Sequence, residues 1–374
     1  MTKKKIINKK TVILISVILG SILIKYCFFS FESGDYKRFL LNWYNTLSEE
    51  GLTSIVNGLG NYNPPYLILL YLLTFLPGSA IVKIKMLSVV FDILMGFMGY
   101  LIVKKLTKGK YAYLCWIIII LLPTVILNSS MWAQCDSIYT TFVLLSIYLL
   151  LKEKYSLSFL SLGVAFSFKL QFIFILPLYM ILYFVNKKFS ILNFLLIPLG
   201  NILMCLPVIL MGMPLVNCFT TYLEQTTDYS VYLTRNLANI YQLLPNIKTI
   251  GMVLFIITGL IFLGLLIYFL KRKKEISKKE IMSIGLLGIL IAVYFLPFMH
   301  ERYMFMADIL SVIWFFIYKR KIYIPILINL SSLAGYSVYL FGFDWMPLWL
   351  FSGCMLFVII SLFLDVIDKK SSPF

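Results

Sequence analysis

The sequence predicts an all-α membrane protein that crosses the bilayer many times. Of its 374 residues, 61% are hydrophobic and 17% are aromatic, and the mean hydropathy of +0.93 is far above that of soluble domains. Apolar stretches recur along the whole chain and are separated by short polar breaks. The net charge of +17 resides in lysine-rich runs within these breaks, a pattern of positive-inside topology signals rather than of nucleic-acid binding.

About 20 apolar residues are needed to cross the hydrocarbon core as a helix. By this criterion we expect about twelve transmembrane helices, several of them so short that they must tilt or thin the bilayer. The apolar segments lie near 11–31, 83–103, 111–128, 137–151, 155–168, 170–185, 190–210, 250–270, 281–298, 303–318, 322–341 and 346–367.

The first segment follows a basic start, MTKKKIINKK, like that of a signal peptide, but no small-residue cleavage site comes after it. We therefore expect an uncleaved first helix and a cytoplasmic tail of residues 1–10. The six cysteines show no CxxC spacing, so they indicate neither a disulfide framework nor a metal site. No internal repeat or linker is visible, and we interpret residues 1–374 as one membrane domain.

One apolar segment decides the topology. Pro64 to Leu76 is about 13 residues long, which is short for a span, and we expect an interfacial or re-entrant helix. If it spanned, the lysine run at 104–110 would fall outside. If it does not, every basic run is cytoplasmic and so are both chain ends. The first large extracytoplasmic loop is then 32–82, with interfacial helices, and the second is 211–249.

Polar groups gather on the predicted outer side. Arginine is rare, with five residues against 28 lysines, yet Arg38, Arg235 and Arg302 fall outside, against the positive-inside bias. A planar guanidinium binds phosphate through two parallel hydrogen bonds, which lysine cannot do. This cluster predicts a phosphate-bearing ligand at the outer leaflet. Snorkelling at the interface is the alternative, and it suits Arg38 best.

The only histidine, His300, lies in a turn with Glu301, Arg302 and Tyr303 between two apolar helices. Charged groups in such a place are costly and predict a functional site. Asp92 and Asp308 lie within apolar helices, where we expect structural pairing instead.

Two further outer breaks carry candidate ligand-binding groups. Asp136 opens a helix after Trp132 and Gln134, where capping of the helix dipole is a competing interpretation. Lys169 and Gln171 interrupt an apolar helix pair, and Lys169 either positions a phosphate or neutralises an acid such as Asp136. Amides and flat rings suit sugar hydroxyls and C–H faces, with an ordinary aromatic belt as the alternative. These candidates are the hydrogen-bonding residues Asn57, Asn61, Tyr62, Asn63, Asn236 and Asn239 and the rings of Trp43, Tyr66 and Trp132.

Taken together, these motifs resemble the bacterial GT-C glycosyltransferases. An acid soon after the first helix, N-Y-N-P-P-Y, W-x-Q-x-D, K-x-Q and M-H-E-R-Y occur in family order between Asp35 and Tyr303. The chain is most similar to the group related to the glycosylphosphatidylinositol-anchor mannosyltransferases, and more distantly to dolichol-linked glucosyltransferases. Ala133 stands where the family often has glycine.

The resemblance implies a GT-C bundle that moves a hexose, with inversion, from a polyprenyl-phosphate donor on the extracytoplasmic face of the cell membrane. Asp35 would be the catalytic base that takes the acceptor hydroxyl proton, with Glu32 and Asp136 as alternatives. Arg302, helped by His300, Lys169 and Arg235, would hold the donor phosphate. The remaining candidates would bind substrate, namely Glu301, Tyr303, Asp136, Gln134, Trp132, Gln171, Asn63, Tyr66, Asn236 and Asn239.

The expected partners are the lipid bilayer, the lipid-linked donor and an acceptor such as a cell-surface polysaccharide, teichoic acid or glycolipid. Outer carboxylates could hold Mg²⁺ or Mn²⁺, although no ligand spacing identifies such a site. A transporter or flippase of a lipid-linked sugar is the rival interpretation. It would more naturally carry charges near the midplane and paired halves, whereas the polar groups here gather at one face.

Overall fold

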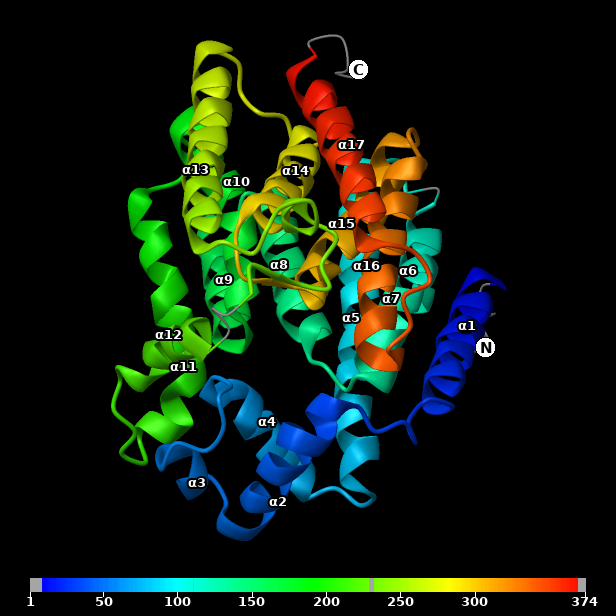
Figure 1. Cartoon of the computed structure of the whole chain (residues 1–374), viewed down its shortest axis with the longest axis vertical. Coiled ribbons are helices and arrows are strands. Elements are labelled where there is room, and N and C mark those ends of the chain that lie inside the picture. The colour runs from blue at the N-terminus through cyan, green and yellow to red at the C-terminus, as the bar shows by residue number, and fades with distance from the viewer. Residues whose placement is uncertain (1–8, 110, 229–231, 369–374) are drawn as a thin grey trace, which may run out of the picture.

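Long helices run roughly side by side in the computed structural model, which describes residues 9–109, 111–228 and 232–368 (Figure 1). The α-helices are α1 Lys9–Tyr26, α2 Leu41–Glu50, α3 Thr53–Val56, α4 Pro64–Thr74, α5 Ala80–Leu106, α6 Ala112–Leu121, α7 Pro123–Ile126, α8 Asp136–Leu151, α9 Tyr155–Phe168, α10 Leu176–Asn186, α11 Leu196–Ile209, α12 Asn217–Asp228, α13 Lys248–Lys271, α14 Glu280–Phe295, α15 Phe305–Tyr318, α16 Tyr323–Phe341 and α17 Leu348–Ile367.

Shorter elements join these helices. Two are π-helical turns, η1 Tyr36–Leu40 and η2 Leu127–Met131, and four are 3₁₀ turns, η3 Leu170–Ile175, η4 Ile191–Leu195, η5 Ile240–Gln242 and η6 Glu301–Met304. Strands β1 Thr234–Arg235 and β2 Met299–His300 form one parallel pair, with Arg235 opposite His300. The tail of residues 1–10 lies mostly outside the described residues.

The helices confirm a polytopic membrane protein. Among the described residues, five helices are long and apolar enough to cross a membrane, and a sixth is added if α6 and the stretch Pro123–Met131 count as one bent span. The bend of 48° falls at Pro123, whose ring cannot continue the preceding helix. The other expected spans also contain helices, but α8, α9 and α14 have only 14 to 16 residues. Twelve spans therefore remain a prediction.

The core is formed by helices that are buried around most of their circumference. Nearly every residue of α14 from Ile281 to Tyr294 is shielded, and α8 and α15 are similar. Helices α9 and α11 approach closely where Gly163 faces Gly200. A Cβ atom on Gly163 would lie 2.5 Å from the carbonyl oxygen of Ile197. Small residues at a helix crossing thus permit the tight packing that holds membrane helices together.

Helix α4 lies beside α2 and α3 at one end of the molecule (Figure 1). Pro64 and Pro65 fit its first turn, where backbone N–H groups have no helical partner. Near its end, Tyr71 lies against Gly51 of the first loop. The chain then turns into α5, and the Lys83 amine donates to the Leu76 carbonyl at 3.0 Å.

Structural pairing was expected for Asp92 and Asp308, and among the described residues Asp92 pairs with a cation whereas Asp308 has only neutral partners. Lys25 of α1 contacts Asp92 of α5 at 2.5 Å, and both side chains are fully buried. Asp308 accepts a hydrogen bond from the Ser332 hydroxyl at 2.7 Å. Because an isolated charge in this setting would be very costly, such contacts fix how neighbouring helices pair.

Candidate functional site

The loop after η2 is held rigidly and aims two side chains at one point. The Ser33 hydroxyl donates to the Trp132 carbonyl at 2.8 Å, and the Ser88 hydroxyl donates to the Gln134 carbonyl at 2.7 Å. Between them Ala133 has a φ of 63°, in the left-handed region that disfavours a Cβ atom. The side chains of Trp132 and Gln134 consequently face the Asp35 carboxylate.

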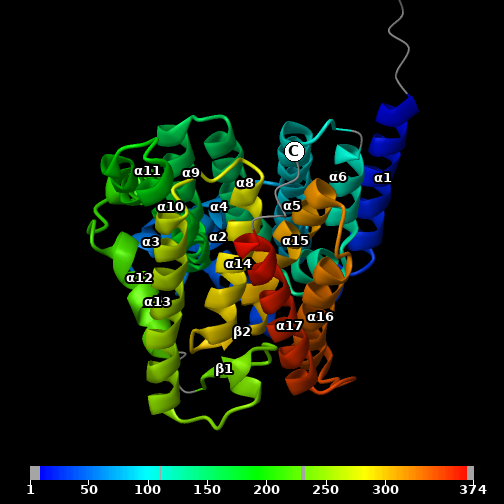
Figure 2. The same ribbon diagram turned by 90° about the horizontal axis from the view of Figure 1, so that it is seen from above.

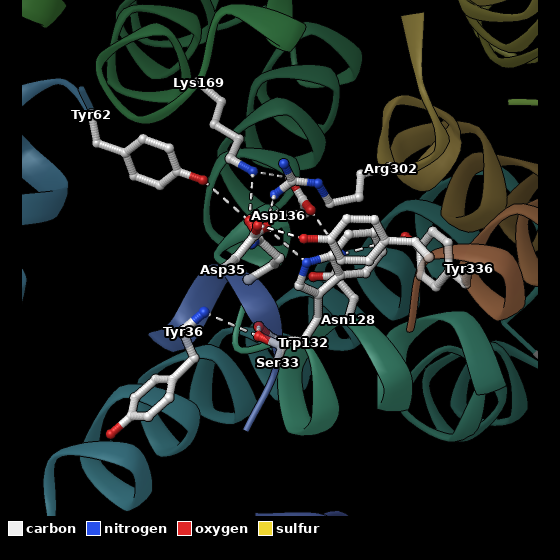
Figure 3. Close-up of polar contacts among 12 residues, drawn as sticks. Ser33, Asp35, Tyr36, Tyr62, Asn128, Trp132, Asp136, Lys169, Arg302 and Tyr336 are labelled. Atoms are coloured by element: carbon white, nitrogen blue, oxygen red, sulfur yellow. Dashed lines mark hydrogen bonds and ion pairs between the residues drawn. The ribbon is translucent and has the colours of Figure 1, made fainter. Parts of the chain in front are cut away.

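Asp35 is the centre of a hydrogen-bond network (Figure 3). Its Oδ2 atom accepts from Trp132 Nε1 and Gln134 Nε2, each at 2.8 Å. Its Oδ1 atom accepts from the Tyr339 hydroxyl at 2.6 Å. The side chain is 20% exposed. Since each carboxylate oxygen has two lone pairs, Oδ1 retains one for a further donor.

Arg302 lies beside this carboxylate. Its Nη1 atom is 3.8 Å from Asp35 Oδ2, and its guanidinium lies 5.0 Å from the centre of the Trp132 ring. The Tyr339 ring also stacks on that indole, with ring centroids 4.3 Å apart. Among the described residues, Arg302 Nε and Nη1 have no hydrogen-bond partner. The guanidinium is thus fixed in place by rings and keeps donors for an anion.

A second acid and cation pair lies next to the first. Lys169 contacts Asp136 Oδ1 at 2.5 Å, and both side chains are more than nine-tenths buried. Asn128 donates to Asp136 Oδ2 at 2.7 Å. The Lys169 amine also lies 3.5 Å from Gln134 Oε1, to which the Tyr62 hydroxyl donates. Asp136 therefore neutralises Lys169, one of the two roles predicted for that lysine.

Strand pairing brings together Arg235 and His300, the other two residues predicted to help hold the donor phosphate. The pair β1–β2 sets Arg235 opposite His300. The next residue, Asn236, has a φ of 52°. Its carbonyl oxygen would lie 2.2 Å from a Cβ atom on Gly335 of α16, so this close contact requires glycine there. The His300 and Tyr303 rings are 5.3 Å apart.

Burial and neighbouring charges shift the pKa values of the titratable groups in the cluster in different directions. Burial raises the pKa of Asp35, but the Arg302 charge and the hydrogen bonds from Tyr339 and Trp132 outweigh it and hold that pKa below its usual value. Burial, with the Arg302 and Arg235 charges, lowers the pKa of His300 to about 3. His300 is therefore neutral near pH 7 and can offer a hydrogen bond but no charge.

Glu301 responds in the opposite direction. Burial raises its pKa to about 7, although the Arg302 charge lowers it. The Oε2 atom of Glu301 has no hydrogen-bond partner among the described residues, and the side chain is buried against α16 near Gly335. This carboxyl group accordingly changes its charge near neutral pH.

The structure brings most of the predicted site residues together. A connected network contains Asp35, Trp132, Gln134, Asp136, Lys169 and Arg302. The turn that carries Arg302 adds His300, Glu301 and Tyr303, and Tyr303 bonds to Gln171. Strand β1 contains Arg235 and is followed by Asn236. Glu32, the alternative base, instead pairs with Lys37 at 3.5 Å on the exposed surface.

Three predicted residues have structural partners. The Asn63 amide donates to the Ser167 carbonyl and to Asn201. Tyr66 packs edge-on against the Tyr62 ring. Asn239 caps η5 through the Tyr241 backbone N–H. Their expected contact with substrate stays a prediction.

Three residues of the cluster were missed by the sequence analysis as site residues, namely Asn128, Tyr336 and Tyr339. Tyr62, a predicted hydrogen-bonding group, donates to Gln134. Tyr336 and Tyr339 are three residues apart near the end of α16, so they share one helix face. Both rings contact Trp132. The available signal was a tyrosine pair at this spacing near the end of an apolar helix.

No three His, Cys, Asp or Glu side chains group around a common point within residues 9–109, 111–228 and 232–368. The expectation of Mg²⁺ or Mn²⁺ thus remains without a candidate site among them. No known family model matches the chain, and no curated protein matches it either.

The raised pKa of Glu301 predicts a pH-dependent stability. From its ordinary pKa of 4.5 up to about 7, the folded protein keeps a proton that the unfolded chain loses, so stability falls as the pH rises through this window. In Glu301→Gln this component should vanish, and the melting temperature should change less between pH 5 and 8. Thermal unfolding of the purified protein in detergent measures it. An unchanged pH slope in the variant would show that Glu301 does not titrate there.

Proposed function

We propose that the protein is an integral-membrane inverting glycosyltransferase of the GT-C type, which moves a hexose from a polyprenyl-phosphate donor to an extracytoplasmic acceptor. The observation that carries the proposal is the pairing of a partly exposed Asp35 with Arg302, 3.8 Å apart, whose buried Nε and Nη1 atoms have no hydrogen-bond partner among the described residues. These two residues supply the two functions that inverting transfer requires, a base for the acceptor hydroxyl and an anion-binding group for the departing phosphate.

The reaction needs a proton acceptor on one side of the anomeric carbon and anion stabilisation on the other. The acceptor hydroxyl hydrogen-bonds to the remaining lone pair of Asp35 Oδ1 and gives up its proton as its oxygen bonds to the anomeric carbon. The bond from that carbon to the phosphate oxygen breaks, and the electron pair leaves with the polyprenyl phosphate. Arg302 binds that phosphate, with Arg235 and a neutral His300 nearby.

The lowered pKa of Asp35 has a consequence for this step. The carboxylate is ionised at neutral pH and ready to accept a proton, but it is a weak base. Proton transfer is then favourable only once the hydroxyl oxygen has begun to bond to carbon and has become more acidic. Asp35 would act late along the reaction coordinate, and its hydrogen bonds to Trp132 and Tyr339 would also orient it.

The resemblance described above supports this function through a detail of the backbone. The left-handed φ of Ala133 is a conformation in which glycine is favoured, and the family often has glycine at that position. Ala133 therefore adopts, without being glycine, a backbone conformation that the family's glycine would favour. This geometry is what aims Trp132 and Gln134 at Asp35.

We further propose twelve spans in the cell membrane with both chain ends cytoplasmic, so that the Asp35 cluster lies outside. Ion pairs gather the basic breaks at the other end, where Lys278 meets Glu153 at 2.6 Å and Lys188 meets Glu275 at 2.7 Å. Within this topology α4 is interfacial and both of its flanks are extracytoplasmic.

The topology predicts that Asn57→Cys and Ser79→Cys, both at exposed positions flanking α4, react with an impermeant thiol reagent added outside cells. The exposed native Cys27 is first replaced by serine to remove its background. Lys152→Cys, in a basic break, should react only after permeabilisation. Labelling of the two flanking positions from opposite sides would make α4 a span and reverse the later helices.

Asp35→Asn keeps the shape of the side chain but cannot accept the proton. Turnover should fall by about two to four powers of ten while donor binding stays near normal. The measurement is transfer of radiolabel from a panel of polyprenyl-phosphate hexoses to membrane glycolipid or wall polymer, with binding measured separately. Glu32→Gln, at the surface pair, is the matched control. Full activity in Asp35→Asn with loss in Asp136→Asn would assign the base to Asp136.

Arg302→Lys keeps a positive charge but loses the two-pronged contact with phosphate. We expect kcat/KM for the donor to fall about 10- to 100-fold, since one charge-assisted hydrogen bond contributes about 1.5–3 kcal/mol. Arg38→Lys, at an exposed position of the same region, serves as the control and should leave the rate unchanged. Wild-type donor kinetics in Arg302→Lys would refute the phosphate role.

A further inference from the structure

A second group of charged side chains surrounds a cavity far from Asp35. The cavity has a volume of about 310 Å³ and lies among the last turns of α13, α15 and α17 and the first turn of α14. Helix α16 ends beside Asp35, and α17 then runs 20 residues away from that end. At 1.5 Å per residue, the cavity is about 30 Å from the Asp35 cluster. Its cations are Arg272, Lys274, Lys279 and Arg320.

The acids that face this cavity neutralise only part of its positive charge. Arg272 pairs with Glu280 at 2.5 Å, and Arg320 pairs with Asp365 at 3.3 Å. The Nε atoms of both arginines are buried and have no hydrogen-bond partner among the described residues.

Two lysines complete this lining. Among the described residues, Lys274 and Lys279 form no salt bridge. The acids that line the cavity are Glu280, Asp365 and Asp368. The lining thus contains four cations, three acids and unsatisfied N–H donors, which together suit a singly charged anion.

An apolar groove adjoins the cavity on the membrane side. It has a volume of about 570 Å³ and lies between α13, α14 and α17. Tyr268 lines both spaces, and its hydroxyl donates to the Ile367 carbonyl at 2.8 Å. Gly264 opens the groove on the α13 side, since a Cβ atom there would meet nothing within 4 Å.

Helix α13 is the least enclosed of the long helices, with 22% of its apolar window buried. In Figures 1 and 2 it lies at the edge of the bundle, to one side of α14. The groove between it and α17 is accordingly accessible from the bilayer.

We propose that this cavity and groove together bind an anionic phospholipid, with its phosphodiester among Arg272, Lys274 and Lys279 and an acyl chain along α13 and α17. A polar, cation-rich cavity that adjoins an apolar groove at Tyr268 matches a molecule that has a charged head and a hydrocarbon tail. The polyprenyl-phosphate donor is a different ligand, because its phosphate must reach Arg302 about 30 Å away. The lipid site holds whether or not the Asp35 cluster transfers a sugar.

The test is native mass spectrometry of the purified full-length protein titrated with dioleoylphosphatidylglycerol or with dioleoylphosphatidylcholine. The wild type should bind the anionic lipid more tightly. Lys274→Gln with Lys279→Gln should weaken it about 10- to 30-fold, since each basic group contributes about a factor of five. Lys271→Gln with Lys273→Gln removes the same charge from the end of α13 and the residues after it, outside the cavity, and should have little effect. Equal losses in both pairs would mean unspecific attraction and overturn the site.

The tail is tested by Gly264→Phe, which fills the groove with a ring and should weaken binding of the anionic lipid about tenfold. Gly259→Phe is its control, because that glycine is also exposed on α13 and has open space but does not line the groove. Glycerophosphoglycerol, the deacylated head group with the same single phosphodiester charge and no tail, should compete poorly. If it binds as tightly as the lipid, or if Gly264→Phe binds like the wild type, a lipid is not the ligand.

Discussion

The hydrogen bonding of the Asp35 carboxylate is the interaction on which the arrangement of the candidate site depends. The carboxylate accepts hydrogen bonds from Trp132, Gln134 and Tyr339, which come from two other parts of the chain, and a third part adds Arg302. Removing a charged group from water is costly unless it is paired and hydrogen-bonded. The loop after η2 and the end of α16 must therefore stay where these bonds can form.

This requirement explains several local features that would otherwise be unfavourable. Ala133 adopts a left-handed backbone conformation because the loop must present Trp132 and Gln134 on the same side. Gly335 lacks a Cβ atom because the Asn236 carbonyl presses against α16. That contact follows from the β1–β2 pairing, which also holds the turn before Arg302. A left-handed backbone at Ala133 and Asn236 and a tight glycine contact thus occur at the candidate site.

Charge is distributed unevenly within the cluster. Lys169 and Asp136 neutralise each other in a buried pair, whereas Arg302 is only loosely paired and retains donors. The cluster can therefore attract an anion, while its other charges remain paired when no anion is bound. The opposite end of the bundle repeats the principle with different chemistry, since Arg272 and Arg320 are paired while Lys274 and Lys279 remain available. The apolar helices between the two ends separate the two charged clusters.

The sequence alone determined the membrane class, the positions of the long helices and the choice of Asp35, Arg302, Lys169 and the Trp132 loop as a candidate site. These depend on local signals, namely apolar segment length, lysine runs and charges that interrupt apolar stretches. Only the tertiary structure decided which groups meet. Tyr339 is 304 residues from Asp35, Asn63 and Asn239 are bonded to structural partners, and Lys169 is neutralised by Asp136. Such pairings depend on how helices distant in sequence pack, because a hydrogen bond requires two groups about 3 Å apart and no local pattern specifies that distance.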